Sequence, residues 1–335
     1  MDDKRLIDRK RESSGHTDVG TLEDGAIVEM KEIAGRLLII KERSIYEMVF
    51  ADKIDPERTN INLPTTIHKL IIDKGSDSEI VARTFLTAKT IFKPEYLNDS
   101  IKCDIILGLS INLLPEFSLL EKEVQEYLKE ENKASLEYEK RKKEKASFQL
   151  PSIINLETRC KTIFQKADHI EQILIEIIAH FYPDKNLKKQ SHFPKFYEIL
   201  KAKYGESDDF SQFVSGTLHF MRAVRELRNG LDHRLATCKI TDFELTVDGD
   251  ILSPTIELNH KDVKVERVAL NNLLNLLIEN LIKIIEVTFT FLAGRAVRPN
   301  GMAYQLKEIP KEKRRYEFVR YSFWIPVGDE GFYCQ

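Results

Sequence analysis

The chain has 335 residues, of which 42% are hydrophobic and 31% charged, enough for about two domains with sizeable cores and well-solvated surfaces. Its formal net charge is −3, so no chain-wide basic field attracts nucleic acid or an anionic membrane, and a nucleic-acid partner would need a local patch. The low counts of 14 glycines and 11 prolines argue against a collagenous or largely disordered protein.

The cysteines and the hydropathy of the chain indicate its compartment. The four cysteines stand far apart and none forms a Cys-x-x-Cys pair, which argues against a zinc ribbon and a dense disulfide framework. The N-terminal residues lack the apolar core of a signal peptide. The most hydrophobic stretch, residues 273–292, carries Glu279, Lys283 and Glu286, too many charges for a membrane span. We therefore expect a soluble, cytoplasmic protein of a reducing compartment, without a membrane partner.

The N-terminal half divides into three predicted parts. Residues 1–25 are polar and charged, which is typical of a flexible arm. Residues 26–117 predict a small α+β domain of unknown role, with strands over 36–40 and 45–51 and a helix over 78–92.

Residues 118–150 predict a long charged helix, because 8 acidic and 8 basic residues occur between positions 121 and 145. Its apolar residues follow a three–four spacing that Glu131 interrupts. A helical spacer between domains is favoured, and a dimerisation coil is the alternative. The apolar positions are Phe117, Leu120, Val124, Tyr127, Ala134 and Tyr138.

The second half is predicted to be mostly helical. Apolar spacing indicates helices over 156–182, 194–204, 211–234 and 265–292, and the Asp248-Gly249 pair predicts a β-hairpin over 239–258. This pattern thus predicts a helical bundle with an inserted hairpin over residues 152–294, followed by a basic and aromatic segment over 295–335. The expected fold class is mainly α: this bundle, preceded by the small α+β domain and the long charged helix.

The predicted helix over 211–234 holds the most informative side chains. Its apolar face contains Phe220, Met221, Val224, Leu227 and Leu231, and its polar face contains Arg222, Arg225, Glu226, Arg228, Asn229, Asp232 and His233. Arginine donors match phosphate oxygens, and an imidazole can move a proton near neutral pH. By spacing alone, a merely solvated polar face is the commoner explanation.

The run Arg228-Asn229-Gly230-Leu231-Asp232-His233, late in the third helix of a small bundle, resembles the HEPN superfamily over residues 152–294. The signature is an Arg, often followed by Asn or another polar residue, with a His a few positions on. The resemblance implies a metal-independent endoribonuclease of antiviral, toxin–antitoxin or RNA-processing systems. It also implies a homodimer in which two Arg–His sets face one cleft.

The family pattern maps onto Arg228, Asn229 and His233 as catalytic residues. His233 would act as general base or acid, Arg228 would offset charge on the phosphorane, and Asn229 would orient phosphate or imidazole. The 2′-hydroxyl of RNA would attack the adjacent phosphate and leave a 2′,3′-cyclic phosphate and a 5′-hydroxyl, with no metal and no cofactor. From helix geometry we add three substrate-binding residues, Arg222, Arg225 and Asp232.

Partners follow from the same resemblance. They are RNA, a second copy of the chain, and an antitoxin or sensor protein. In toxins silenced by nucleotidylation a Tyr lies two positions beyond the His, whereas Leu235 stands there in this chain. Control by nucleotidylation at that position is therefore not expected.

A second function class stays open. A non-catalytic HEPN module would bind RNA or a protein through residues 295–320. This segment contains eight Lys and Arg but only three Glu, with aromatic residues between them. Glu176 and His180 stand four residues apart on one predicted helix. Because the sequence shows no third ligand at a suitable spacing, an ion pair is favoured over a metal site. Five further histidines have no partner readable in the sequence: His68, His169, His192, His219 and His260.

Overall fold

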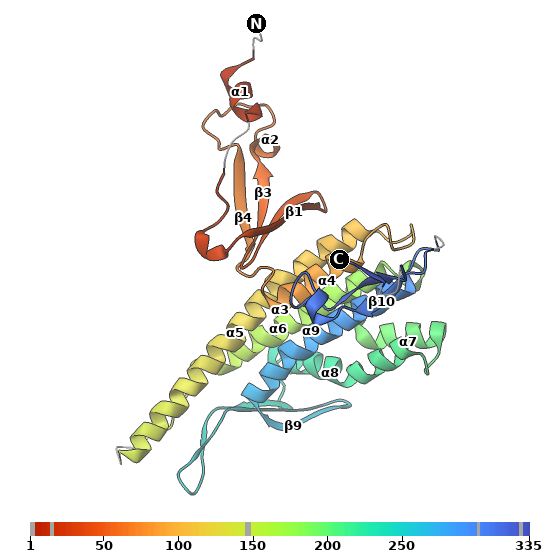
Figure 1. Cartoon of the computed structure of the whole chain (residues 1–335). Helices are drawn as coiled ribbons and strands as arrows, with labels where there is room; N and C mark the ends of the chain where they lie inside the picture. The colour runs from red at the N-terminus through yellow and green to blue at the C-terminus, as the bar shows by residue number, and fades with distance from the viewer. Residues whose placement is uncertain (1–3, 14–16, 145–148, 300–301, 328–330) are drawn as a thin grey trace. The chain divides into compact units, whose positions relative to one another are not determined.

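The computed structural model describes residues 4–13, 17–144, 149–299, 302–327 and 331–335. The chain forms two compact units (Figure 1). Unit 1 consists of Met1–Pro115 together with Ala293–Gln335, and unit 2 consists of Glu116–Leu292. This division differs from the expected one, because the last segment of the chain belongs with the N-terminal half.

The fold is mixed α+β, with 51% of residues in helices and 19% in strands. The strands of the described residues form four antiparallel sheets. The expectation of a mainly α fold is therefore wrong. Several strands were missed because charged residues stand between their apolar ones, as in IVEMKEI at 27–33 and VKVERVA at 263–269.

Unit 1 begins with an antiparallel meander in the order β1-β2-β3-β4. Its core contains the buried Val19, Ile39 and Met48, with Leu37 and Tyr46 packed against them. The predicted strands over 36–40 and 45–51 are confirmed. The elements are α1 (Leu6–Glu12), η1 (Leu22–Asp24), β1 (Ile27–Ile33), β2 (Arg36–Lys41), β3 (Ile45–Phe50), α2 (Ala51–Ile54) and β4 (Thr66–Ile72).

The remainder of unit 1 joins a buried helical segment to a C-terminal sheet. The helix predicted over 78–92 is confirmed as α3 (Glu79–Val81), the π-helical η2 (Ala82–Leu86) and α4 (Thr87–Ile91). The C-terminal sheet contains β10 (Gln305–Glu308), β11 (Tyr321–Ile325) and β12 (Phe332–Cys334), with η5 (Lys311–Lys313) between the first two. Buried Phe323 of β11 packs on the ring of Tyr96 at 4.9 Å, so burial of aromatic surface explains why residues 295–335 belong to this unit.

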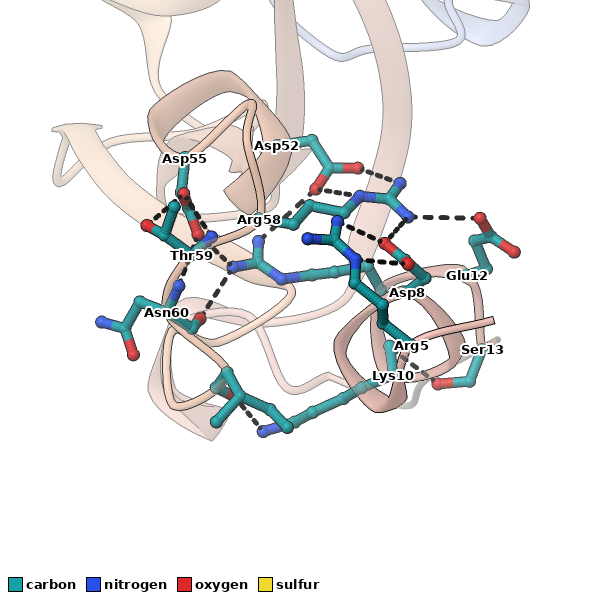
Figure 2. A network of polar contacts seen from close by, with 12 residues as sticks. Arg5, Asp8, Lys10, Glu12, Ser13, Asp52, Asp55, Arg58, Thr59 and Asn60 are labelled. Atoms are coloured by element: carbon teal, nitrogen blue, oxygen red, sulfur yellow. Dashed lines mark hydrogen bonds and ion pairs between the residues drawn. The ribbon is translucent and has the colours of Figure 1, made fainter. Parts of the chain in front are cut away.

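A polar network holds α1, so residues 4–13 do not form the free arm expected from composition (Figure 2). Arg58 contacts Asp8 and Glu12 of α1, both at 3.2 Å, and Asp52 at 2.8 Å. Lys10 donates to the carbonyl of Ile61 at 2.8 Å. These contacts tie the helix to the loop around residues 52–61.

This network predicts that α1 loosens in acid. The hydrogen bonds from Arg5 and Arg58 lower the pKa of Asp8 from 3.8 to about 2. A carboxylate with a depressed pKa contributes its stability above its unfolded pKa and loses it as the pH falls toward the folded value. Amide exchange in residues 6–12 should therefore accelerate between pH 4 and pH 2, relative to β2 and β3. In Asp8→Asn this acceleration should be largely absent, and an unchanged acid response in that variant would contradict the role of Asp8.

Unit 2 is built from long helices and two small sheets. The predicted helices over 156–182, 194–204 and 211–234 are confirmed, and the predicted hairpin pairs Thr241 with Thr255 and Leu245 with Ile251. Residues 265–269, expected to be helical, instead form strand on β8. The elements are α5 (Cys103–Lys143, begun in unit 1), α6 (Leu156–Ala179), η3 (Pro183–Lys185), η4 (Lys189–Ser191), α7 (His192–Tyr204), α8 (Asp209–Asp232), β5 (Cys238–Thr241), β6 (Glu244–Leu245), β7 (Ile251–Leu252), β8 (Thr255–His260), β9 (Val263–Ala269) and α9 (Leu270–Arg295).

The C-terminal part of α5 is neither a solvated spacer nor a free dimerisation seam. Its apolar positions Phe117, Leu120, Val124 and Tyr127 are fully buried in this chain. Glu131, which breaks the apolar series, is also buried and accepts a hydrogen bond from Asn271 of α9 at 2.8 Å. The charged helix is therefore part of unit 2.

Helix α5 also bears on the membrane question. Among the described residues it is the one helix that is long and apolar enough to span a bilayer, and half of its apolar window is buried in the protein. A core helix of a soluble protein passes the same test, so this is a weak indication of a membrane span. The apolar stretch singled out in the sequence, 273–292, lies in α9.

All four cysteines are free thiols. Burial raises the pKa of Cys103 and of Cys238 to about 11, and that of Cys160 to about 12. Thiols with such pKa values hold little thiolate at neutral pH, so these three side chains behave as apolar packing residues.

Candidate functional site

Helix α8 positions the predicted site through capped ends and a buried face. At its start the Asp208 carboxylate accepts from the backbone N–H groups of Phe210 and Ser211, at 3.0 and 3.2 Å. At its end the backbone N–H of His233 donates to the carbonyl of Asn229 at 3.0 Å. Of the five residues predicted for its apolar face, Met221, Val224, Leu227 and Leu231 are buried, whereas Phe220 is only half-buried.

The structure brings Arg228, Asn229 and Asp232 together in one polar cluster. Arg228 Nη1 donates to Asn229 Oδ1 at 3.0 Å, and Arg228 Nε lies 2.9 Å from Asp232 Oδ2. Lys161 of α6 lies 3.1 Å from the other oxygen of Asp232. The Arg228 side chain keeps 31% of its surface exposed, so it is oriented by its neighbours and still accessible to a ligand.

His233 follows this cluster immediately in the chain and is exposed. Within the described parts of the chain, its imidazole has no hydrogen bond or ion pair. The ring is therefore accessible to solvent and to a bound substrate.

The other predicted residues of α8 are only partly available. Arg225 Nε lies 3.4 Å from Glu226 Oε1, and Arg222 is half-buried. Glu226 was placed on the polar face but is buried. Although burial opposes ionisation, the hydrogen bond from Lys261 at 3.1 Å lowers the pKa of Glu226. Arg222 is thus better placed than Arg225 to meet a phosphate.

Sequence reasoning missed an acidic pair behind Arg228. Asp168 and Glu171 lie one turn apart on α6 and are buried, and Asp168 Oδ2 is 4.0 Å from Arg228 Nε. His192, at the start of α7, lies 3.4 Å from Glu171 through its Nδ1. The available signal was the position of both carboxylates beside the apolar stripe of α6, where a charged residue needs a partner.

Two other predicted features of α6 differ from expectation. Glu176 and His180 do not form the expected ion pair within the described residues. His169, for which the sequence showed no partner, lies 3.2 Å from Glu116 of α5.

Gly230, inside the motif, allows the small sheet to approach α8. A Cβ at this position would lie 2.5 Å from Cys238 Cβ and 3.6 Å from Leu258 Cδ1. Gly230→Ala should therefore destabilise unit 2 by about 1–3 kcal/mol, because overpacking outweighs the helix propensity gained. Gly216→Ala on the same helix meets nothing within 4 Å and should be neutral or stabilising. Urea unfolding followed by circular dichroism compares them, and equal effects would exclude the close approach as the cause.

Unit 1 contains a second polar site, a small basic cavity of about 70 Å³. Lys89 pairs with Glu29, which also accepts from Tyr316 Oη at 3.1 Å. Burial lowers the pKa of Lys93, and in the described residues Lys93 has no ion-pair partner. The cavity thus presents four cations against one carboxylate, and its charged and aromatic lining comprises Glu29, Lys31, Lys89, Lys93, Arg315 and Tyr316.

Comparison with protein-family models finds no matching family, and comparisons with curated proteins and with solved structures find no match either. The HEPN resemblance therefore depends on the motif at Arg228–His233 and on the order of the helices, and it stays a prediction.

Proposed function

We propose that this protein is a cytoplasmic, metal-independent endoribonuclease of HEPN type that acts at the C-terminal end of α8. The observation that supports the proposal is the arrangement of the motif: Arg228 is held by Asn229 and Asp232, and the exposed His233 follows Asp232 in the chain. An oriented guanidinium and an accessible imidazole are the two groups that cleavage of a phosphodiester with an internal nucleophile needs.

In the proposed reaction the ribose 2′-oxygen forms a bond to the adjacent phosphorus, and the bond from phosphorus to the 5′-oxygen breaks. One proton leaves the 2′-hydroxyl and one is delivered to the departing 5′-oxygen. The products are a 2′,3′-cyclic phosphate and a 5′-hydroxyl. Arg228 offsets the charge on the phosphorane oxygens, while Asn229 and Asp232 fix its orientation. Arg222 and Arg225 are proposed to contact flanking phosphates.

A homodimer is part of the proposal, because the reaction uses a general base and a general acid. One α8 motif contributes a single histidine, His233, and a second copy would supply the other. Light scattering coupled to gel filtration measures the molar mass in solution and so tests whether the protein is a dimer. The dimer would belong to a toxin or antiviral system if expression of the wild-type chain, and not of His233→Ala, stops growth of the host.

The direct test is incubation of the purified protein with mixed RNA in excess chelator, followed by mapping of the product ends. Fragments with 2′,3′-cyclic phosphate and 5′-hydroxyl ends are expected from RNA. DNA of the same sequence should stay intact, because it lacks the 2′-hydroxyl. Products with 3′-hydroxyl ends, or cleavage only after magnesium is restored, would contradict the proposed chemistry.

The basic cavity of unit 1 favours a second candidate function, an RNA-binding module without catalysis. The partly buried Lys93, which lacks an ion-pair partner in the described residues, is suited to bind a phosphate. In this case Lys93→Ala and Arg315→Ala should weaken binding of labelled RNA, measured by fluorescence anisotropy, while RNA stays intact. A nuclease would instead cleave RNA and depend on His233.

A further inference from the structure

Two carboxylates are buried side by side in unit 2 with incomplete compensation. The side chains of Asp168 and Glu171 are 3% and 1% exposed. Asp168 Oδ2 accepts from Gln172 Nε2 at 2.7 Å, and Glu171 Oε1 accepts from the backbone N–H of Phe193 at 3.0 Å. The second oxygen of each carboxylate, Asp168 Oδ1 and Glu171 Oε2, has no hydrogen-bond partner in the described residues. Buried anionic oxygens without partners are strongly disfavoured unless a cation binds them.

His192 completes this group from a different helix. Its Nδ1 also lacks a hydrogen-bond partner, and it lies 3.4 Å from Glu171 Oε2. One ligand atom from each of Asp168, Glu171 and His192 lies within 4.8 Å of the others. The backbone of His192 has φ 56° and ψ 167°, a conformation that side-chain-bearing residues rarely adopt. Packing around α7 therefore keeps the imidazole over the carboxylates at some conformational cost.

We propose that Asp168, Glu171 and His192 bind a divalent transition-metal ion, with zinc as the best match. Carboxylate oxygen and imidazole nitrogen ligands lie about 2.0–2.2 Å from zinc. Two such ligands at a tetrahedral angle stand about 3.4 Å apart, which is the separation of Glu171 Oε2 and His192 Nδ1. The mixed nitrogen and oxygen donors disfavour magnesium and calcium, which prefer oxygen ligands alone.

The surroundings of the group are those that a bound metal requires. Gln172 and the Phe193 amide each donate to one oxygen of Asp168 and of Glu171, which orients the carboxylates and leaves the other oxygen of each available. Arg228 Nε stands 4.0 Å from Asp168 Oδ2. A cation on Asp168 would take up its negative charge and leave Arg228 freer to bind a phosphate. The ion would also fasten the start of α7 to α6, so its role is structural and does not depend on the proposed nuclease.

The competing explanation is a simple ion pair between a protonated His192 and Glu171. The two explanations differ for the amide variants Asp168→Asn and Glu171→Gln. Each variant keeps an oxygen that can accept from Gln172 or Phe193, so the fold has the same hydrogen bonds available. An amide removes the charge that a metal needs, so zinc should no longer raise the thermal midpoint of either variant. Under the ion-pair explanation, zinc should not change the thermal midpoint of the wild type either.

The experiment measures zinc binding to the full chain by titration calorimetry and by elemental analysis after gel filtration. The wild type should bind one equivalent, and its thermal midpoint should rise with zinc. Asp168→Asn, Glu171→Gln and His192→Ala should each lose at least 10-fold in affinity. His169→Ala removes another histidine that pairs with a carboxylate, outside this group, and should bind as the wild type does.

The proposal is overturned if the wild type binds no zinc above the level of a nonspecific surface site, or if the amide variants retain one equivalent at unchanged affinity. Circular dichroism of every variant guards against loss of folding. Should His192→Ala fail to fold, the two amide variants and the zinc-dependent thermal midpoint of the wild type still decide the question. None of these readouts uses RNA cleavage, so they remain informative if the chain has no nuclease activity.

Discussion

Replacing His233 by alanine is expected to reduce RNA cleavage by about 10²–10⁴-fold, the usual contribution of a positioned general acid or base. The side chain is exposed and has no partner in the described residues, so its removal should leave the thermal midpoint unchanged. Loss of cleavage at constant stability is what distinguishes a catalytic histidine from a structural one. The measurement is the initial rate of cleavage of a labelled RNA in chelator.

The matched control for this variant is His219→Ala, because His219 is an exposed histidine of α8, the helix that ends immediately before His233. It should cleave RNA at the wild-type rate. Arg228→Lys is a second useful variant, because it keeps the charge beside Asp168 and Asp232 but removes the forked donors. We expect it to fold and to cleave slowly. Equal rates for wild type and His233→Ala would show that the assigned residue is not catalytic.

Truncating Phe210 to alanine is expected to destabilise unit 2 by about 3–5 kcal/mol. Phe210 is fully buried at the start of α8, stacks on Phe291 of α9 at 4.7 Å and meets the edge of Phe196 of α7 at 5.5 Å. Its loss removes packing among three helices at once and leaves a cavity. Because α8 carries Arg228 and ends immediately before His233, cleavage should fall together with the folded fraction.

Urea unfolding followed by circular dichroism measures this effect. The control is Phe213→Ala, one turn along α8, whose side chain is only partly buried and lies 5.8 Å from Phe291. We expect a clearly smaller loss for that variant. If the two variants were equally stable, the aromatic cluster around Phe210 would not be the support of α8 that the packing indicates.

The proposed motif and the proposed metal group test different properties of unit 2. Arg228 belongs to the first and also lies 4.0 Å from Asp168 of the second. An effect of zinc on cleavage would therefore indicate coupling through this contact, whereas zinc binding without such an effect would indicate a purely structural ion. Both outcomes agree with the separate experiments proposed for the two sites.

The sequence by itself determined the helices of unit 2 and the hairpin, because long apolar periodicity and an Asp-Gly turn are local signals. It also placed Arg228, Asn229 and Asp232 on one helix face.

Only the tertiary structure decided the remaining features of the fold. The strands at 27–33 and 263–269 are stabilised by backbone pairing with residues 36–41 and 255–260, which the periodicity of their own side chains does not reveal. Residues 295–335 belong to one compact unit with the N-terminal half. Several acidic residues are buried because other elements bring them partners. Glu131 contacts Asn271, and Glu226 contacts Lys261. Of the pair Asp168 and Glu171, Glu171 contacts His192. The periodicity of a single helix cannot predict such partners, because they are separated in sequence and come into contact only when the helices pack.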